Sequence, residues 1–153
     1  MDKKSSAMEI RKKYKLSKSI IGEEEIAAIS DVLKREYLGM GEEVHKFESL
    51  LKDYFLRDVL CVNTGTAALQ LSLQAIGIKE NDEVLVQSLT YVATFQAITA
   101  CGAIPIACEV CPETLTIDVE DAQKKVTSKT KAIIPVHYSG NTGDLDKIYQ
   151  FAQ

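Results

Sequence analysis

The chain has 153 residues, of which 46% are hydrophobic and 26% charged, a composition typical of a globular domain and not of collagen, coiled coils or disordered chains. Its 18 basic and 22 acidic residues give a formal net charge of -4. The longest mostly apolar stretch, 97–108, is interrupted by Gly102 and Pro105, whereas a membrane-spanning helix needs about 20 apolar residues. Because the first 15 residues also lack the apolar core of a secretory signal, we expect a cytoplasmic protein with no membrane partner.

Basic residues gather at the start of the chain. Residues 1–18 hold seven basic and two acidic residues, a net charge of +5, and such a segment can bind nucleic acid or anionic lipid. No recognisable nucleic-acid-binding module follows it. We therefore predict that residues 1–15 form a solvated, flexible tail, that residues 16–153 form the globular part, and that nucleic acid is not a partner.

Helical and strand patterns alternate along the rest of the chain. Apolar residues at helical spacing predict helices over 23–35 and 42–55. The apolar run at 59–62 predicts a buried strand, and 67–76 a largely buried helix after it. The remaining elements follow in the same alternation: strand 83–87, helix 90–100, strand 104–108, helix 119–126 with Asp118 as its cap and Asp121 in its first turn, strand 132–137 and helix 144–152.

Strands separated by helices of about ten residues need crossover connections, which produce a parallel sheet covered on both faces. The predicted fold class is therefore α/β, with three layers (α/β/α) and a mainly parallel sheet. The last helical pattern reaches Gln153 without a glycine cap or a proline stop. Four strands would also leave a sheet edge that normally receives a cover, so we expect the chain to be the first part of a larger protein.

Cys108 and Cys111 form a C-x-x-C pair, a spacing found in redox and zinc sites. Zinc would need a second close pair, whereas Cys61 and Cys101 are 40 residues apart. A redox thiol should open a helix, but Pro112 follows Cys111 directly. We interpret the four cysteines as thiols of a reducing compartment and predict no metal site.

The loop at 63–68, between a predicted strand and a predicted helix, is built from small residues. Free N–H groups at a helix start bind phosphate, and Gly65 would allow close approach. The alternative is that Thr64 or Thr66 merely caps the helix. On the same sheet edge, Tyr91 could stack on a flat ring, or it could be a packed core aromatic. Neither the G-x-G-x-x-G nor the P-loop motif of nucleotide sites is present.

Several segments, in order, resemble the N-terminal half of the DegT/StrS family of pyridoxal-phosphate-dependent nucleotide-sugar aminotransferases. The segments are TGTAAL at 64–69, NDEVLV at 81–86, SLTYVAT at 88–94, GAIP at 102–105 and TKAIIPVHYSG at 130–140. The resemblance covers nearly the whole chain from about residue 16. It implies part of the large domain of a fold-type I pyridoxal-phosphate-dependent transferase, with pyridoxal 5'-phosphate as cofactor and a homodimer as the intact enzyme.

The resemblance also implies which residues hold the cofactor. Gly65, Thr66 and Ala67 match the phosphate-binding turn, and Tyr91 matches the aromatic residue that stacks on the pyridine ring. His137 lies in a Pro-Val-His motif whose chemistry the sequence does not assign, and a structural hydrogen bond is an equal alternative.

The implied reaction is amino transfer, usually from glutamate, to a nucleotide-linked keto sugar for polysaccharide or glycan biosynthesis. In the family, the aspartate that pairs with the pyridine nitrogen and the Schiff-base lysine both follow the Pro-Val-His segment, beyond Gln153. We therefore expect no catalytic residue in this chain and no activity of the chain alone. A sugar dehydratase of the same fold and a truncated, non-catalytic binding or regulatory homologue are the alternatives.

Overall fold

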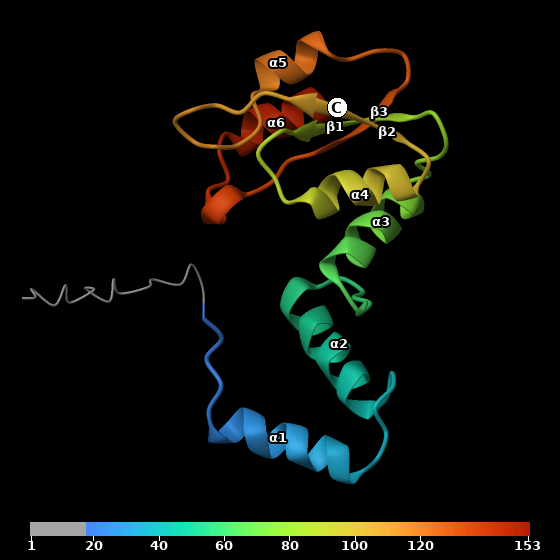
Figure 1. Ribbon diagram of the computed structural model, residues 1–153, viewed down its shortest axis with the longest axis vertical. Coiled ribbons are helices and arrows are strands. Elements are labelled where there is room, and N and C mark those ends of the chain that lie inside the picture. Colours follow the sequence, from blue (N-terminus) through green and yellow to red (C-terminus); the bar gives the residue numbers. More distant parts are fainter. Residues whose placement is uncertain (1–17) are drawn as a thin grey trace, which may run out of the picture. The chain divides into compact units, whose positions relative to one another are not determined.

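The computed structural model describes residues 18–153 (Figure 1). It divides into two compact units, with the boundary in the sequence between Val59 and Leu60, and each unit is described by itself. The basic tail predicted for residues 1–15 lies outside the described residues, so the boundary at residue 16 stays a prediction. No helix among the described residues is long and apolar enough to cross a membrane.

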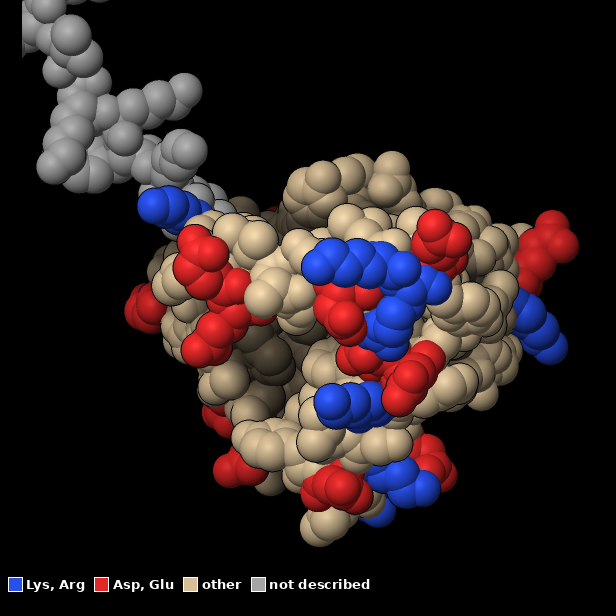
Figure 2. Space-filling model, turned by 90° about the horizontal axis from the view of Figure 1, so that it is seen from below, with Lys and Arg blue, Asp and Glu red and all other residues tan. Residues whose placement is uncertain are grey.

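The first unit contains two helices, α1 (Glu23–Lys34) and α2 (Glu42–Phe55), which confirm the two helices predicted there. Gly22 precedes α1 and donates its N–H to Glu25 Oε2 at 2.7 Å. Between the helices, Arg35 forms ion pairs with Asp31 at 3.1 Å and with Glu43 at 2.8 Å. Figure 2 shows basic and acidic side chains interspersed on one face of the described chain. Neither helix contains a buried residue.

The second unit is built on a parallel sheet of three strands in the order β2-β1-β3. The strands are β1 (Glu83–Gln87), β2 (Ile104–Cys108) and β3 (Thr130–Ile134). The helices are α3 (Gly65–Ala75), α4 (Val92–Ala100), α5 (Val119–Lys124), the 3-10 helix η1 (Tyr138–Gly140) and α6 (Leu145–Ala152).

Side chains of the central strand alternate between two cores. Val84 and Val86 pack with residues of α3 and α4, whereas Leu85 packs on the other face with residues of α5 and α6. Figure 1 shows α3 and α4 on one side of the sheet and α5 on the other. Because a strand buried on both faces cannot alternate apolar and polar residues, β1 is apolar from Val84 to Val86. The predicted α/β class with three layers is confirmed.

Two predictions about the start of the second unit are wrong. Residues 59–62 form no strand in the described chain, and Leu60 is 84% exposed. An apolar run becomes a strand only where a neighbouring strand accepts its hydrogen bonds, and no described strand lies beside it. The helix that follows was predicted to be largely buried, but Leu73 is the only buried residue of α3.

The last strand ends earlier than predicted, at Ile134 rather than at His137. Pro135 has no N–H to donate, and the N–H of Val136 donates to the side chain of Gln87 instead of a strand. In contrast, the predicted cap of α5 is confirmed, since Asp118 Oδ1 accepts the N–H of Glu120 at 2.8 Å.

Candidate functional site

A cavity of about 760 Å³ opens where β1 and β3 end, on the carboxyl side of the parallel sheet. Ligands of open parallel sheets bind at this edge, where loops lead from strands into helices. Three segments line the cavity: the first two turns of α3, the entry into α4, and the loop after β3. Its lining residues are Gly65, Thr66, Ala68, Leu69, Ser72, Thr90, Tyr91, Ala93, Thr94, Val136, His137, Tyr138 and Ser139.

At the start of α3, Thr64 is the capping residue. Its Oγ1 accepts the N–H of Ala67 at 3.0 Å, and its carbonyl accepts the N–H of Ala68 at 3.1 Å. The capping alternative is therefore confirmed for Thr64. The N–H groups of Gly65 and Thr66, which come next, have no acceptor within the helix because they belong to its first turn. These two donors face the end of α3 that borders the cavity.

Gly65 occupies open space. A Cβ added there would meet no atom within 4 Å, and the residue does not have a positive φ. Neither packing nor backbone conformation in the described chain thus requires glycine at this position. Gly65 is also one of the residues that line the cavity.

Tyr91 immediately precedes α4 and is 78% exposed. The alternative of a packed core aromatic is therefore wrong. Its carbonyl accepts the N–H of Thr94 at 3.0 Å, and the hydroxyls of Thr90 and Thr94 are 2.8 Å apart. These bonds shape the entry into α4, and the exposed side chain of Tyr91 lines the cavity.

The loop after β3 brings His137, Tyr138 and Ser139 to the cavity. It turns sharply, because Ser139 has a left-handed conformation with a φ of 53° and Gly140 donates its N–H to the His137 carbonyl at 3.0 Å. His137 is exposed. The predicted structural hydrogen bond of its imidazole stays a prediction.

The structure brings three of the four predicted cofactor-binding residues together, namely Gly65, Thr66 and Tyr91. Ala67 does not line the cavity, and its N–H is already bonded to Thr64. Sequence reasoning missed Thr90, Thr94 and Ser139. Threonines four residues apart lie on one side of a helix, which is a signal that could have singled out Thr90 and Thr94.

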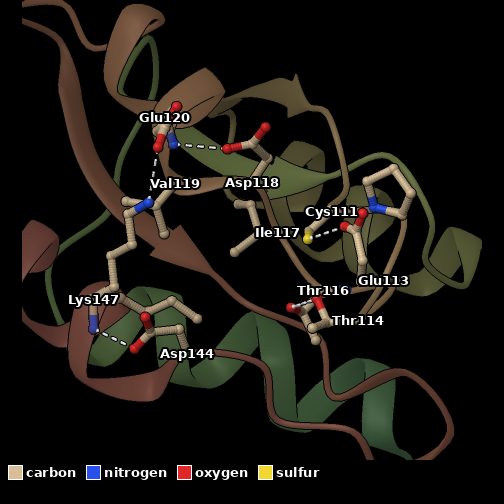
Figure 3. Close-up of a pocket in the computed structure, with 12 residues that line it drawn as sticks. Cys111, Glu113, Thr114, Thr116, Ile117, Asp118, Val119, Glu120, Asp144 and Lys147 are labelled. Carbon is tan, nitrogen blue, oxygen red and sulfur yellow. Dashed lines mark hydrogen bonds and ion pairs between the residues drawn. The ribbon is translucent and has the colours of Figure 1, made fainter.

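A second cavity, of about 410 Å³, lies between the β2–α5 loop and the starts of α5 and α6 (Figure 3). Its polar side chains bind one another: Cys111 Sγ donates to Glu113 Oε2 at 3.0 Å, and Lys147 Nζ lies 3.2 Å from Glu120 Oε1. Cys108, the other half of the C-x-x-C pair, is buried, and burial raises the pKa of its thiol. No cluster of candidate metal ligands occurs among residues 18–153.

A model of the DegT/DnrJ/EryC1/StrS aminotransferase family matches residues 19–153. A curated relative, the dTDP-4-dehydro-2,3,6-trideoxy-D-glucose 4-aminotransferase of Saccharopolyspora spinosa, is 34% identical over 141 residues, which cover 90% of this chain and 37% of the relative. The chain thus spans little more than a third of that protein.

Two similar proteins of known structure have the same fold as this chain over the matched residues. A Streptococcus pneumoniae protein assigned as a sugar aminotransferase, with structures of its PLP and PMP forms, is 33% identical with a TM-score of 0.81, and the match covers 86% of this chain and 34% of that one. The GDP-4-keto-6-deoxy-D-mannose-3-dehydratase of E. coli, solved with bound hydrated PLP, is 28% identical with a TM-score of 0.81, over 91% of this chain and 38% of that one. Since the family model matches most of its length, the chain belongs to the DegT/DnrJ/EryC1/StrS aminotransferase family.

Proposed function

We propose that this chain supplies the phosphate-binding and ring-stacking part of the pyridoxal 5'-phosphate site of a sugar aminotransferase. The observation that carries the proposal is the single cavity lined by Gly65, Thr66 and Tyr91. The PLP and PMP forms of the S. pneumoniae protein support the choice of cofactor.

The first turn of α3 suits the cofactor phosphate. The N–H groups of Gly65 and Thr66 and the Thr66 hydroxyl can donate to phosphate oxygens, and the positive end of the helix dipole adds to the attraction. The open space at Gly65 leaves room for close approach. Ala67 could donate only after its bond with Thr64 opened, so Gly65 and Thr66 carry most of this role.

Tyr91 would orient the ring. Its side chain is exposed at the cavity and can stack on a flat heteroaromatic ring. When bound, pyridoxal phosphate supplies the electron sink that amino transfer requires. The contribution of this chain is to fix the phosphate and one ring face, so that the reactive part of the cofactor is held in one orientation.

The proposed reaction moves an amino group, from glutamate, to a keto sugar linked to a nucleotide, in glycan or polysaccharide biosynthesis. The Saccharopolyspora relative, whose name gives a dTDP-linked keto sugar, supports the substrate class. We further propose a cytoplasmic homodimer as the working enzyme. Dehydration of such a sugar is the second candidate, because the E. coli dehydratase matches the chain with the same TM-score as the S. pneumoniae protein.

The cofactor proposal is tested with pyridoxamine 5'-phosphate, which lacks the aldehyde that would react with surface lysines. The chain is titrated with this compound and with pyridoxamine, and binding is followed by phosphorus and proton NMR. We expect pyridoxamine 5'-phosphate to bind at least about tenfold more tightly, because only it reaches the donors of α3. Equal affinities would contradict the proposed phosphate site.

The reaction is tested separately. The protein is expressed from its complete reading frame and incubated with glutamate and a dTDP-linked 4-keto sugar, and the products are identified by mass spectrometry. An amino sugar together with 2-oxoglutarate supports amino transfer, whereas loss of water from the sugar supports the second candidate. Cofactor binding without turnover of either kind would favour a non-catalytic homologue.

A further inference from the structure

Gln87, the last residue of β1, is fully buried although it is polar. Its side-chain Nε2 donates to the Leu89 carbonyl at 2.8 Å and to the Leu115 carbonyl at 3.3 Å. Its Oε1 accepts the N–H of Val136 at 2.9 Å. One amide thus joins the loop after β1, the loop between β2 and α5, and the segment after β3.

The orientation of this amide follows from its partners. Two carbonyl oxygens need donors and one N–H needs an acceptor, and only an amide with Nε2 toward the carbonyls provides both. All of its N–H groups are used. No other type of side chain of similar size offers two donors and an acceptor without a charge, and a charge buried at this point would be costly.

Two of the three segments held by Gln87 continue directly into the cavity. Leu89 is followed by Thr90 and Tyr91, and Val136 is itself a lining residue that leads into His137. We infer that Gln87 is a positioning residue of the cofactor site: it fixes the segment that carries Tyr91 relative to the segment that carries His137. The inference rests on the proposed function and extends it to a residue that does not itself touch the cavity.

Replacing Gln87 removes these bonds in a controlled way. Gln87→Met keeps a side chain of similar length but leaves the Val136 N–H and two carbonyls without partners inside the protein. Buried polar groups without partners are unfavourable, so the two loops should shift until these groups reach water. The segment that carries Tyr91 would then no longer be held relative to the segment that carries His137.

The control is Asp82→Ala. Asp82 is also buried, and its Oδ2 accepts the N–H of Lys79 at 3.0 Å, but it lies just before β1, at the amino end of the strand and away from the cavity. Both variants should lower the urea midpoint. Gln87→Met should in addition weaken binding of pyridoxamine 5'-phosphate by about tenfold or more and accelerate hydrogen exchange of the Val136 amide, whereas Asp82→Ala should change neither.

Gln87→Glu adds a pH signature. The carboxylate can accept from Val136 but cannot donate to Leu89 or Leu115, while the protonated acid can donate to one of them. The folded state therefore favours the protonated form and raises the pKa of this carboxyl, so the native contacts are present at low pH and lost as pH rises. The affinity of Gln87→Glu relative to the native chain should recover on acidification, and that of Gln87→Met should not.

The outcomes separate this inference from the proposed function. If the native chain shows no preference for the phosphorylated compound, the proposed function fails, while exchange at Val136 still reports whether Gln87 fixes the loop. If Gln87→Met lowers stability as Asp82→Ala does, but leaves ligand affinity and Val136 exchange unchanged, Gln87 is a structural residue only and the inference is overturned.

Discussion

Gly65 occupies a position at which neither packing nor backbone conformation in the described chain requires glycine. Other glycines of the second unit have backbone reasons: Gly77 and Gly102 have φ values of 83° and 74°, a region that side chains disfavour. Gly65 has no such conformation and no neighbour within 4 Å of an added Cβ. Gly65 therefore leaves open space at the start of a helix whose first residues line the cavity.

Gly65→Val should therefore weaken binding of pyridoxamine 5'-phosphate by about tenfold or more and leave stability nearly unchanged, because the new side chain meets ligand and not protein. Ala75→Val, at the other end of the same helix, is the matched control and should not affect binding. Affinity is measured by phosphorus NMR and stability by urea unfolding. A native affinity in Gly65→Val would show that phosphate does not approach this turn.

At the residue level, sequence could predict which side chains lie at one edge of the sheet, whereas their cofactor-binding roles stay a prediction and contacts between distant segments were missed. Gly65, Thr66 and Tyr91 could be predicted because each stands at a strand-to-helix turn of a parallel sheet, and such turns share one edge. The N–H of Ala67 is bonded to the Thr64 hydroxyl, and the side-chain conformation of Thr64 that makes this bond cannot be predicted from the sequence. Gln87 could not be singled out, because its partner Val136 is 49 residues away.

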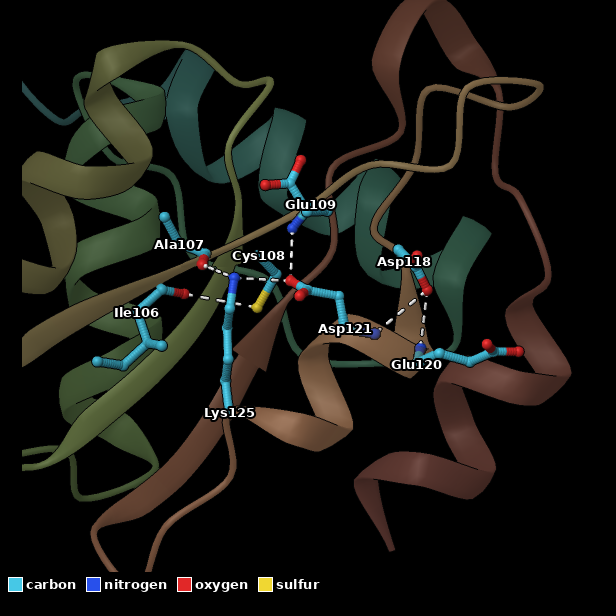
Figure 4. A network of polar contacts seen from close by, with 8 residues as sticks. All are labelled: Ile106, Ala107, Cys108, Glu109, Asp118, Glu120, Asp121 and Lys125. Atoms are coloured by element: carbon cyan, nitrogen blue, oxygen red, sulfur yellow. Dashed lines mark hydrogen bonds and ion pairs between the residues drawn. The ribbon is translucent and has the colours of Figure 1, made fainter.

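At the scale of elements, the side chains of Asp121 in α5 and of Lys125 just after it bind backbone groups at the outer edge of β2 (Figure 4). Asp121 Oδ2 accepts the N–H of Glu109 at 2.8 Å, and Lys125 Nζ donates to the Ala107 carbonyl at 2.8 Å. The two side chains form an ion pair of 2.7 Å. Together with Pro105, which has no N–H, they leave little of this edge for another strand to pair with.

The Asp121–Lys125 pair makes a pH-dependent contribution to stability. Lys125 and the Glu109 N–H lower the pKa of the Asp121 carboxyl, and Asp121 raises the pKa of Lys125. A carboxyl whose pKa is lowered by folding stabilises the folded state at pH values above its ordinary pKa, about 3.9. This stabilisation is lost as pH falls through the lower pKa that the carboxyl has in the folded state. Asp121→Asn keeps an acceptor for Glu109 but loses the charge.

We expect Asp121→Asn to have a lower urea midpoint than the native chain at neutral pH, and the difference to shrink as pH falls below about 3.9 and through the lowered pKa of Asp121 in the folded state, where its carboxyl becomes neutral. Asp31→Asn serves as the control, since it removes an exposed carboxylate of the first unit that also pairs with a basic residue. Its effect should be small, because exposed ion pairs contribute little. A constant difference across pH would mean that the charge of Asp121 does not matter.

Most elements were predictable because their patterns are local. The bounds of α2, β1 and β2 agree with the prediction, and the apolar runs of the two strands end at the polar residues Gln87 and Glu109. Where β3 ends, and whether residues 59–62 form a strand, depend instead on which backbone groups have hydrogen-bond partners in a neighbouring strand. A strand is a property of a pair of segments, and one segment alone cannot define it.

At the scale of the whole molecule, burial differs between the two units. The buried core residues of the described chain all lie between Leu73 and Ile148, in the second unit. In the first unit, the apolar residues Ile26, Ile29 and Leu33 are about half exposed, at 50%, 56% and 55%. Isolated helices of this length are only marginally stable in water, because the favourable free energy of a few helical turns does not exceed the unfavourable free energy of nucleation. The family match nevertheless includes both units.

We therefore expect the two units to differ in their rates of amide hydrogen exchange. Amides of α1 and α2 should exchange quickly, because local opening of these helices exposes little additional apolar surface, whereas amides of β1 should exchange only with opening of the sheet. The measurement is exchange mass spectrometry with peptides covering each element, and α4, which holds four buried residues, is the protected helical reference. Equal protection of α1, α2 and β1 would show that burial within the described chain does not set local stability, and that the first unit gains its order from contacts of another kind.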